Sequence, residues 1–303
     1  ACLFIGLLPS AASMLLCAEL VKNSTEGYLN EKEQAFTASW FRHIPESCLP
    51  TYTAVLLMLN ISEVETSKFM FGMTIPVLVL AFIGYFSYLR RSPAEVNTPK
   101  SKNKWVDLKN LFCHLWSLIL ILVLILGFGM QVVTAVLISI ILSIFIYRIQ
   151  KEELKKFVVS AFEKKMLGNT FLVLVLKEFL TYVGVLEQLP LFLAKLPIPS
   201  YLVFGLVFFL ATVISGSTAA IAMGAPLAFA ALPAGGAPLM VYLMCMVHAA
   251  SQISPTHICL VVASDYYKIS LGEMIRKTLP ASVLFCVLMT LYYCLISNFG
   301  VLL

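Results

Sequence analysis

The chain has 303 residues, of which 60% are hydrophobic and 12% are charged, with a formal net charge of +5. A soluble protein of this length cannot cover so much apolar side chain with polar surface, so the composition excludes a soluble domain. The apolar residues form long blocks rather than short alternating segments, which predicts an all-α polytopic membrane protein and not a barrel. Most basic residues flank these blocks, so they indicate orientation in the membrane, and no nucleic-acid partner is expected.

The first apolar run, Ala1–Leu20, is interrupted by Pro9–Ser13. It starts without Met and without a basic region, so it resembles neither a signal peptide nor a natural start, and we expect sequence to be missing before it. The next apolar piece, Cys48–Ile61, is shorter than the roughly 20 residues that a spanning helix needs. Phe69–Leu89 is long enough for an ordinary span.

A polar, basic segment then separates two parts of the chain. Residues 93–104 are interpreted as a cytoplasmic linker between a first repeat, 1–92, and a second repeat, 105–303. The block Leu111–Tyr147 is long enough for two spans with a turn at Gly127–Gly129. Basic residues at both ends of this block place its turn outside.

The stretch Leu196–Ser264 contains no Lys, Arg, Asp or Glu, yet its helices must break repeatedly. The breaks fall at Ser215–Thr218, Pro226, Leu232–Pro238 and Ile253–His257. They predict re-entrant hairpins and discontinuous helices, because non-helical backbone at membrane depth is tolerated only inside protein or beside a wet cavity. Leu279–Leu303 is predicted as the last span.

The chain repeats itself at an offset of 205 residues. The motif His43-x6-Pro50-Thr51 recurs as His248-x6-Pro255-Thr256, and Ser10 and Ser13 align with Ser215 and Thr218. An internal repeat in so apolar a chain is typical of transporters with two inverted repeats around one site near the bilayer midplane. The alternative is that Ser, Thr and Pro interrupt many membrane helices and align by chance.

The hydroxyl-rich breaks are candidate substrate sites. A half-helix that begins inside the membrane presents free N–H groups and the positive end of its dipole, which suit a carboxylate. The alternative is helix packing through small residues. The predicted substrate-binding residues are Ser10, Ser13, Ser215, Gly216, Ser217 and Thr218.

The two Pro-Thr motifs are candidate sites for a coupling cation. Proline frees a helical carbonyl, and freed carbonyls with hydroxyls form an oxygen-rich site, although a simple proline kink is the alternative. The predicted cation-coupling residues are Pro50, Thr51, Ser254, Pro255, Thr256 and His257. His43 and His248 are interpreted as structural or, alternatively, as proton carriers.

No metal site and no cofactor are expected, apart from Na⁺ as a possible coupling ion. Cys245, His248, His257 and Cys259 match no familiar zinc spacing. Nucleotide-binding and common hydrolase motifs do not occur, so an enzyme is the least favoured class and would need a pair such as His257 with Asp265 in one cavity.

Several motifs resemble the prokaryotic membrane family catalogued as domain of unknown function 401. These motifs are Phe4–Ser10, Trp40–His43, Ser254–Leu260 and Asp265–Lys268. The family is grouped with an ion transporter superfamily that includes carboxylate, gluconate, citrate and arsenite carriers. The family pattern has Pro and Gly after the first Leu-Leu-Pro, where this chain has Ser10-Ala-Ala-Ser13, so its first hairpin tip is expected to differ.

The resemblance implies two inverted repeats, each with a re-entrant hairpin and an unwound helix that meet at one site. Ser10–Ser13 and Ser215–Thr218 would be the hairpin tips, and Pro50-Thr51 and Ser254–Thr256 the unwound segments. It also implies a multi-pass protein of the prokaryotic cytoplasmic membrane.

The sequence thus predicts a secondary active transporter of a small organic anion coupled to Na⁺ or H⁺. One bundle is expected to move against a dimerising scaffold, which makes membrane lipid and a second copy of the chain its partners. The alternative is a non-transporting membrane subunit that binds a partner protein or lipid.

Overall fold

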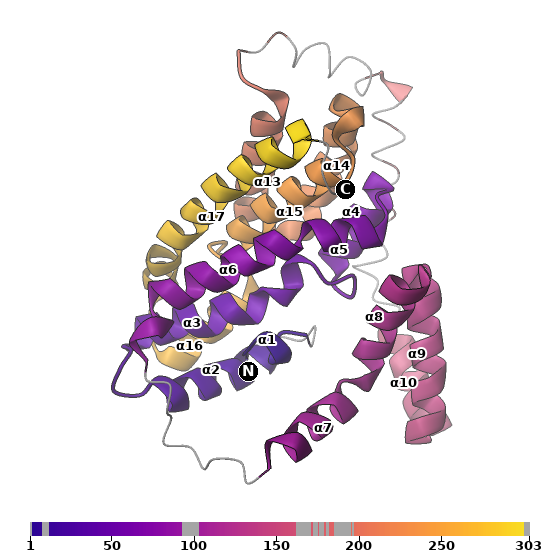
Figure 1. The fold of residues 1–303 in the computed structure, drawn as a ribbon, viewed down its shortest axis with the longest axis vertical. Coiled ribbons are helices and arrows are strands. Elements are labelled where there is room, and N and C mark those ends of the chain that lie inside the picture. Colours follow the sequence, from indigo (N-terminus) through magenta and orange to yellow (C-terminus); the bar gives the residue numbers. More distant parts are fainter. Residues whose placement is uncertain are drawn as a thin grey trace. The chain divides into compact units, whose positions relative to one another are not determined.

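The computed structural model describes residues 2–7, 12–92, 103–161 and 197–299, together with residues 171, 175, 179, 182–184 and 195. All regular structure in these ranges is helical, which confirms the predicted all-α class (Figure 1). The chain packs into two compact units, one made of Ala1–Asn97 with Lys177–Leu303 and one of Thr98–Leu176. The predicted linker, 93–104, lies almost wholly outside the described residues, and the repeat boundaries at 92 and 105 remain a prediction.

The N-terminal part of the first unit contains short helices separated by irregular backbone. They are α1 (Cys2–Ile5), α2 (Ala12–Thr25), α3 (Glu31–His43), α4 (Thr53–Ser62), α5 (Thr66–Gly72) and α6 (Thr74–Ser87), with 3₁₀ turns at Pro45–Ser47 and Leu89–Arg91. A capping box starts α3: the Asn30 side chain accepts from the Glu33 N–H, and the Glu33 carboxylate accepts from the Asn30 N–H. Each bond satisfies a donor that would otherwise be unpaired at the helix start.

The C-terminal part of the same unit contains α13 (Ser200–Ser215), α14 (Ser217–Ala231), α15 (Gly236–Ser251), α16 (Ile258–Tyr267) and α17 (Leu271–Phe299). A 3₁₀ turn, Pro233–Gly235, connects α14 to α15. Gly216 separates α13 from α14, and six irregular residues that include Pro255 separate α15 from α16. Three of the four predicted breaks therefore interrupt helices, whereas Pro226 lies inside α14.

The two parts have the same helix bounds at the offset of 205 residues. Adding 205 to the bounds of α4 gives those of α16, and the starts of α2, α3 and α5 become those of α14, α15 and α17. Even the caps agree, because Glu63 after α4 and Lys268 after α16 are both left-handed, with φ of 56° and 52°. Left-handed backbone is uncommon for residues other than glycine. The offset therefore relates local structure as well as sequence.

Helix packing follows the same relation. α4 packs on α14 as α2 packs on α16, and α5 packs on α15 as α3 packs on α17. Likewise, α13 contacts α14 and α15 as α1 contacts α2 and α3. When each of these helices is replaced by its equivalent in the other part, the same pairs of helices remain in contact. Tyr267 of α16 joins the parts directly, since its hydroxyl donates to the Ala18 carbonyl of α2 at 2.7 Å.

Within the described ranges, three helical stretches are long and apolar enough to cross a membrane: Thr66–Ser87, Pro233–Ser251 and Leu271–Ser297. The first matches a predicted span. The last begins eight residues before the predicted start at 279, because Ser270 and Glu273 cap its N-terminus. The middle stretch, mostly α15, is buried along its length and forms the centre of the unit. With several shorter apolar helices, these features agree with a multi-pass membrane protein.

The second unit contains α7 (Lys104–His114), α8 (Trp116–Phe128), α9 (Val132–Tyr147) and α10 (Lys151–Ala161). α8 and α9 pack as a hairpin around Ile121, Ile125 and Ala135, as predicted for this block. The turn begins at Gly129, whose φ of 64° ends α8. Each helix is shorter than the roughly 20 residues of an ordinary span.

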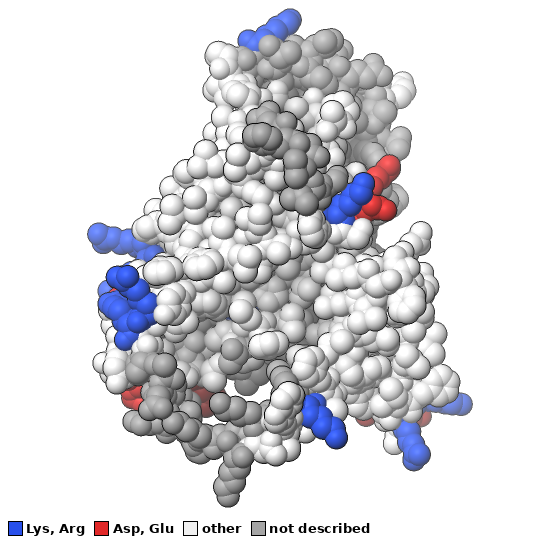
Figure 2. Space-filling view, viewed as in Figure 1, with Lys and Arg blue, Asp and Glu red and all other residues white. Residues whose placement is uncertain are grey.

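Two ion pairs between described residues of the first unit lie near helix ends. Lys32 pairs with Glu273 at 2.6 Å and Arg91 with Glu33 at 2.7 Å, which joins the starts of α3 and α17 to the end of α6. Between such clusters Figure 2 shows wide uncharged surface. An uncharged face between charged ends is the pattern expected of helices that contact lipid.

Candidate functional site

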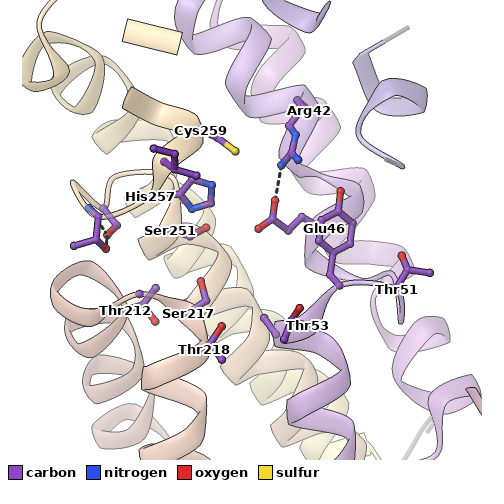
Figure 3. Close-up of a pocket in the computed structure, with 16 residues that line it drawn as sticks. Arg42, Glu46, Thr51, Thr53, Thr212, Ser217, Thr218, Ser251, His257 and Cys259 are labelled. Carbon is purple, nitrogen blue, oxygen red and sulfur yellow. Dashed lines mark hydrogen bonds and ion pairs between the residues drawn. The ribbon is translucent and has the colours of Figure 1, made fainter. Parts of the chain in front are cut away.

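A cavity of about 400 Å³ lies within the first unit, where α4, α14 and α16 begin. Residues of the N-terminal part form one wall and residues of the C-terminal part form the other (Figure 3). The lining residues are Arg42, Glu46, Thr51, Tyr52, Thr53, Ala54, Thr212, Gly216, Ser217, Thr218, Ser251, Ser254, Thr256, His257, Ile258 and Cys259. Most of them are polar, so the cavity differs in chemistry from the apolar helices around it.

The tip between α13 and α14 forms part of the cavity wall. Gly216 has φ 87° and ψ 163°, a conformation that is almost restricted to glycine. The Thr256 hydroxyl oxygen would lie 3.8 Å from a Cβ at this position, so the tip packs on the irregular segment before α16. Ser217 and Thr218 follow in the first turn of α14 and line the cavity.

Two further helices begin at the same cavity. The residues before α4 and α16 are Tyr52 and His257, which are equivalent in the repeat, and both have extended backbone. Among the residues that the structure describes, no side chain caps α4, α14 or α16. A helix start carries up to four N–H groups without an intrahelical acceptor and a partial positive charge. Three such starts converge on one polar cavity.

Arg42 supplies a buried positive charge. Its Nε donates to the Ser13 hydroxyl at 3.0 Å, and its guanidinium donates to Glu46 at 2.6 Å. The Arg42 side chain is 3% exposed, whereas that of Glu46 is 25% exposed. Because Glu46 and Arg42 have opposite charges, their pair adds no net charge to the cavity wall.

A hydroxyl pair follows α15. Ser254 donates to the Val213 carbonyl at 2.9 Å, and its oxygen lies 2.8 Å from the Thr256 hydroxyl. The bond to Val213 holds this segment against the last turn of α13. The Ser254–Val213 hydrogen bond therefore stabilises the position of the Gly216 tip, which directly follows this turn.

Two hydroxyls in the cavity wall have no hydrogen-bond partner among the described residues. They are Thr51 Oγ1 and Thr212 Oγ1, and Thr212 is fully buried. A buried hydroxyl without a partner is unfavourable by roughly 1–3 kcal/mol. Unsatisfied groups in a cavity wall are available to a ligand or ion.

The structure brings most of the predicted site residues together. Seven of the twelve predicted residues line the cavity: Thr51, Gly216, Ser217, Thr218, Ser254, Thr256 and His257. Pro50 and Pro255 are not among the lining residues, and Ser10 lies outside the described residues. Ser13 is buried against Arg42, and Ser215 is exposed and donates to the Ala211 carbonyl of its own helix at 2.7 Å.

Sequence reasoning missed the charged wall. Arg42 and Glu46 are four residues apart, the spacing of a helical ion pair, and they directly precede the Pro50-Thr51 motif. That spacing was the available signal. Thr212 and Cys259 gave no comparable signal, because tertiary packing alone places them in the cavity.

The fold and the site define a helical membrane protein with a polar cavity between two structurally equivalent parts. The chain belongs to the family described as "Protein of unknown function (DUF401)", whose model matches residues 1–296. This finding agrees with the family resemblance in the sequence. A search of curated proteins found no match to the chain.

Proposed function

We propose that the protein is a secondary active transporter that carries a small organic anion together with Na⁺ or H⁺. The observation that carries this proposal is the convergence of three uncapped helix starts on one polar cavity. Backbone N–H groups at helix starts suit a carboxylate, and the hydroxyls of Thr53, Ser217 and Thr218 add donors.

Two inverted repeats are the architecture that we infer for this transporter. The equal helix bounds and exchanged packing partners support it, as does the resemblance to the ion transporter superfamily. α13 and α14 have 16 and 15 residues, so each is about 23 Å long, shorter than the roughly 30 Å hydrocarbon core. Two packed helices of this length joined at Gly216 suit a re-entrant hairpin whose tip lies at membrane depth.

The coupling cation is assigned to the irregular segments before α4 and α16. Ser254 and Thr256 present paired hydroxyl oxygens, and Thr51 and Thr212 present hydroxyls without partners among the described residues. Hydroxyl and carbonyl oxygens are the ligands that Na⁺ prefers. One repeat bundle moving against a dimerising scaffold would expose the cavity alternately to the two sides.

Other classes receive less support. A non-transporting scaffold would favour a closed, apolar junction, whereas the described residues surround a polar cavity. An intramembrane enzyme of the kind considered needs His257 and Asp265 in one cavity. Asp265 is exposed near the end of α16 and is not among the lining residues.

The test is uptake into proteoliposomes. A panel of labelled mono-, di- and tricarboxylates is offered under an imposed Na⁺ or proton gradient. We expect gradient-dependent uptake of at least one anion and its loss in the combined variant Ser217→Ala, Thr218→Ala, Thr256→Val. Ser215→Ala is the matched control, because this hydroxyl is exposed and bonded within its own helix. Equal uptake by the combined variant and the parent would overturn the site assignment.

A further inference from the structure

We propose that His43, His257 and Cys259 form a Zn²⁺ site in the cavity wall. His43 is the last residue of α3, His257 directly precedes α16, and Cys259 lies in the first turn of α16. Their ligand atoms all lie within 4.8 Å of one another. Two imidazoles and a thiol are the nitrogen and sulfur ligands that zinc selects.

The spacing of the ligand atoms suits a tetrahedral ion. The two Nε2 atoms of His43 and His257 are 3.0 Å apart, with the ring planes at 82°. Zinc–nitrogen bonds of about 2.0–2.1 Å and zinc–sulfur bonds of about 2.3 Å place neighbouring ligand atoms about 3.3–3.6 Å apart. The observed separations, 3.0 Å between the two Nε2 atoms and at most 4.8 Å within the cluster, bracket this spacing.

His43 is oriented as a metal ligand. Its Nδ1 lies 2.6 Å from the Ser39 carbonyl oxygen, one helical turn earlier. A carbonyl only accepts, so this contact assigns the N–H to Nδ1 and leaves a lone pair on Nε2, which faces His257. A backbone carbonyl on the second ring nitrogen is the usual support of a zinc-bound histidine. The helix itself therefore fixes both the tautomer and the ring orientation.

The cavity gives an ion access to the site and leaves its fourth position open. His257 and Cys259 line the cavity (Figure 3), whereas His43 is fully buried and is not among the lining residues. Glu46 Oε2 lies 3.9 Å from His43 Nε2, but this oxygen accepts from Arg42 at 2.6 Å. The zinc ion would therefore have three ligands from the described residues, and its fourth coordination position would face the cavity. The Glu46 carboxylate offsets the Arg42 charge that would otherwise repel a cation.

The site joins the two repeat copies. His43 lies 214 residues before His257, and the packing of α3 on α16 brings them together. No short motif could predict such a site. The rival occupant is a single proton shared between the two facing imidazole nitrogens, which explains their short separation without a metal.

Cobalt titration of the purified full chain distinguishes these occupants. Co²⁺ replaces Zn²⁺ in tetrahedral sites, and a thiolate ligand produces a charge-transfer band in the near ultraviolet. We expect the parent to bind one Co²⁺ per chain with this band, and Zn²⁺ to displace it. Cys259→Ser should abolish the band, and both Cys259→Ser and His257→Asn should weaken binding by at least about tenfold.

Two variants of α15 provide matched controls. Cys245→Ser and His248→Asn alter a buried thiol and a buried imidazole outside the cluster and should leave the titration unchanged. X-ray absorption of zinc-loaded parent protein, expected to show two nitrogen ligands and one sulfur ligand from the protein, needs no variant to fold. A parent that binds no Co²⁺, or a band that persists in Cys259→Ser, would overturn the proposal. Because neither measurement depends on uptake, the transport proposal stands or fails separately.

Discussion

Residues 12–87 and 217–299 contain equivalent helices, yet they contribute different chemistry to the cavity. Arg42 and Glu46 of the first copy correspond to Val247 and Ser251 of the second. The backbone is therefore repeated while the charge is one-sided. A ligand bound between the copies would meet hydroxyls and helix starts from both, but a guanidinium from one alone. The backbone of the cavity is therefore symmetric, and a few side chains make its two walls chemically different.

The residues before α4 and α16 show the same contrast. Tyr52 donates its hydroxyl to the Gly6 carbonyl, so it ties α4 to the N-terminal segment. Its equivalent, His257, instead faces His43 across the junction between the copies. Tyr52 thus has a structural role, whereas His257 brings a titratable, metal-ligating group to the cavity. The two residues occupy equivalent backbone positions, but their side chains differ in chemistry and therefore in role.

The largest effect is expected from removal of the one-sided charge. Arg42→Met removes the hydrogen bonds that Arg42 donates to Glu46 and Ser13 and should destabilise the protein by about 3 kcal/mol, the usual result of breaking a buried pair. Uptake should be lost as well. Unfolding of the purified protein in detergent measures the first effect, and proteoliposome uptake the second.

Arg91→Met is the control for this charge. Arg91 is 48% exposed, and without it the Glu33 carboxylate still lies 4.0 Å from Lys277, so its loss should destabilise by less than about 1 kcal/mol. If both variants lose the same stability, the buried Arg42–Glu46 pair is no stronger than a partly exposed pair. The charged pair that only the first copy contains would then make no special contribution to folding stability.

The next effect concerns the Gly216 tip. Gly216→Ala forces a side chain into a glycine-only conformation and should cost about 1–3 kcal/mol of folding stability. Gly272→Ala in the first turn of α17 is the control, since a Cβ there meets nothing within 4 Å. That substitution should be neutral or stabilising by up to about 1 kcal/mol. Similar stability of the two variants, measured by thermal unfolding, would contradict the strained tip.

A smaller effect of opposite sign is expected at Thr212. Thr212→Val removes a buried hydroxyl that has no partner in the described part of the chain, so it should stabilise the protein by about 1 kcal/mol while reducing uptake. Thr278→Val is the control, because its buried hydroxyl donates to the Met274 carbonyl at 3.0 Å and its loss should be slightly destabilising. Unchanged uptake in Thr212→Val would remove this hydroxyl from the proposed cation site.

The smallest effect on the structure is expected from two single cysteine substitutions that test whether the two repeats have opposite orientations in the membrane. Glu63 and Lys268 occupy equivalent left-handed turns, so inverted repeats place them on opposite sides of the membrane. We expect a membrane-impermeant maleimide to label Glu63→Cys from outside and Lys268→Cys from the cytoplasmic side only. Labelling of both from one side would show parallel repeats or a different topology.

The sequence predicted the class, the repeat and much of the cavity. Long apolar blocks required helices, and the hydroxyl and proline breaks marked Gly216 and Thr256 because such residues interrupt helices locally. The sequence did not predict where α17 begins, since the Ser270 and Glu273 cap adds two turns before the apolar run. It also assigned Ser215 to the site, whereas that hydroxyl bonds within its own helix.

Composition and local helix breaks by themselves determined that this chain is a helical membrane protein with a repeated, interrupted core. Those properties depend on neighbours in sequence, because apolar length and backbone hydrogen bonding act within one segment. Only the tertiary structure decided that Arg42 reaches Ser13 and that His43 meets His257. These contacts join residues 29 and 214 positions apart, so they depend on which helix faces pack together.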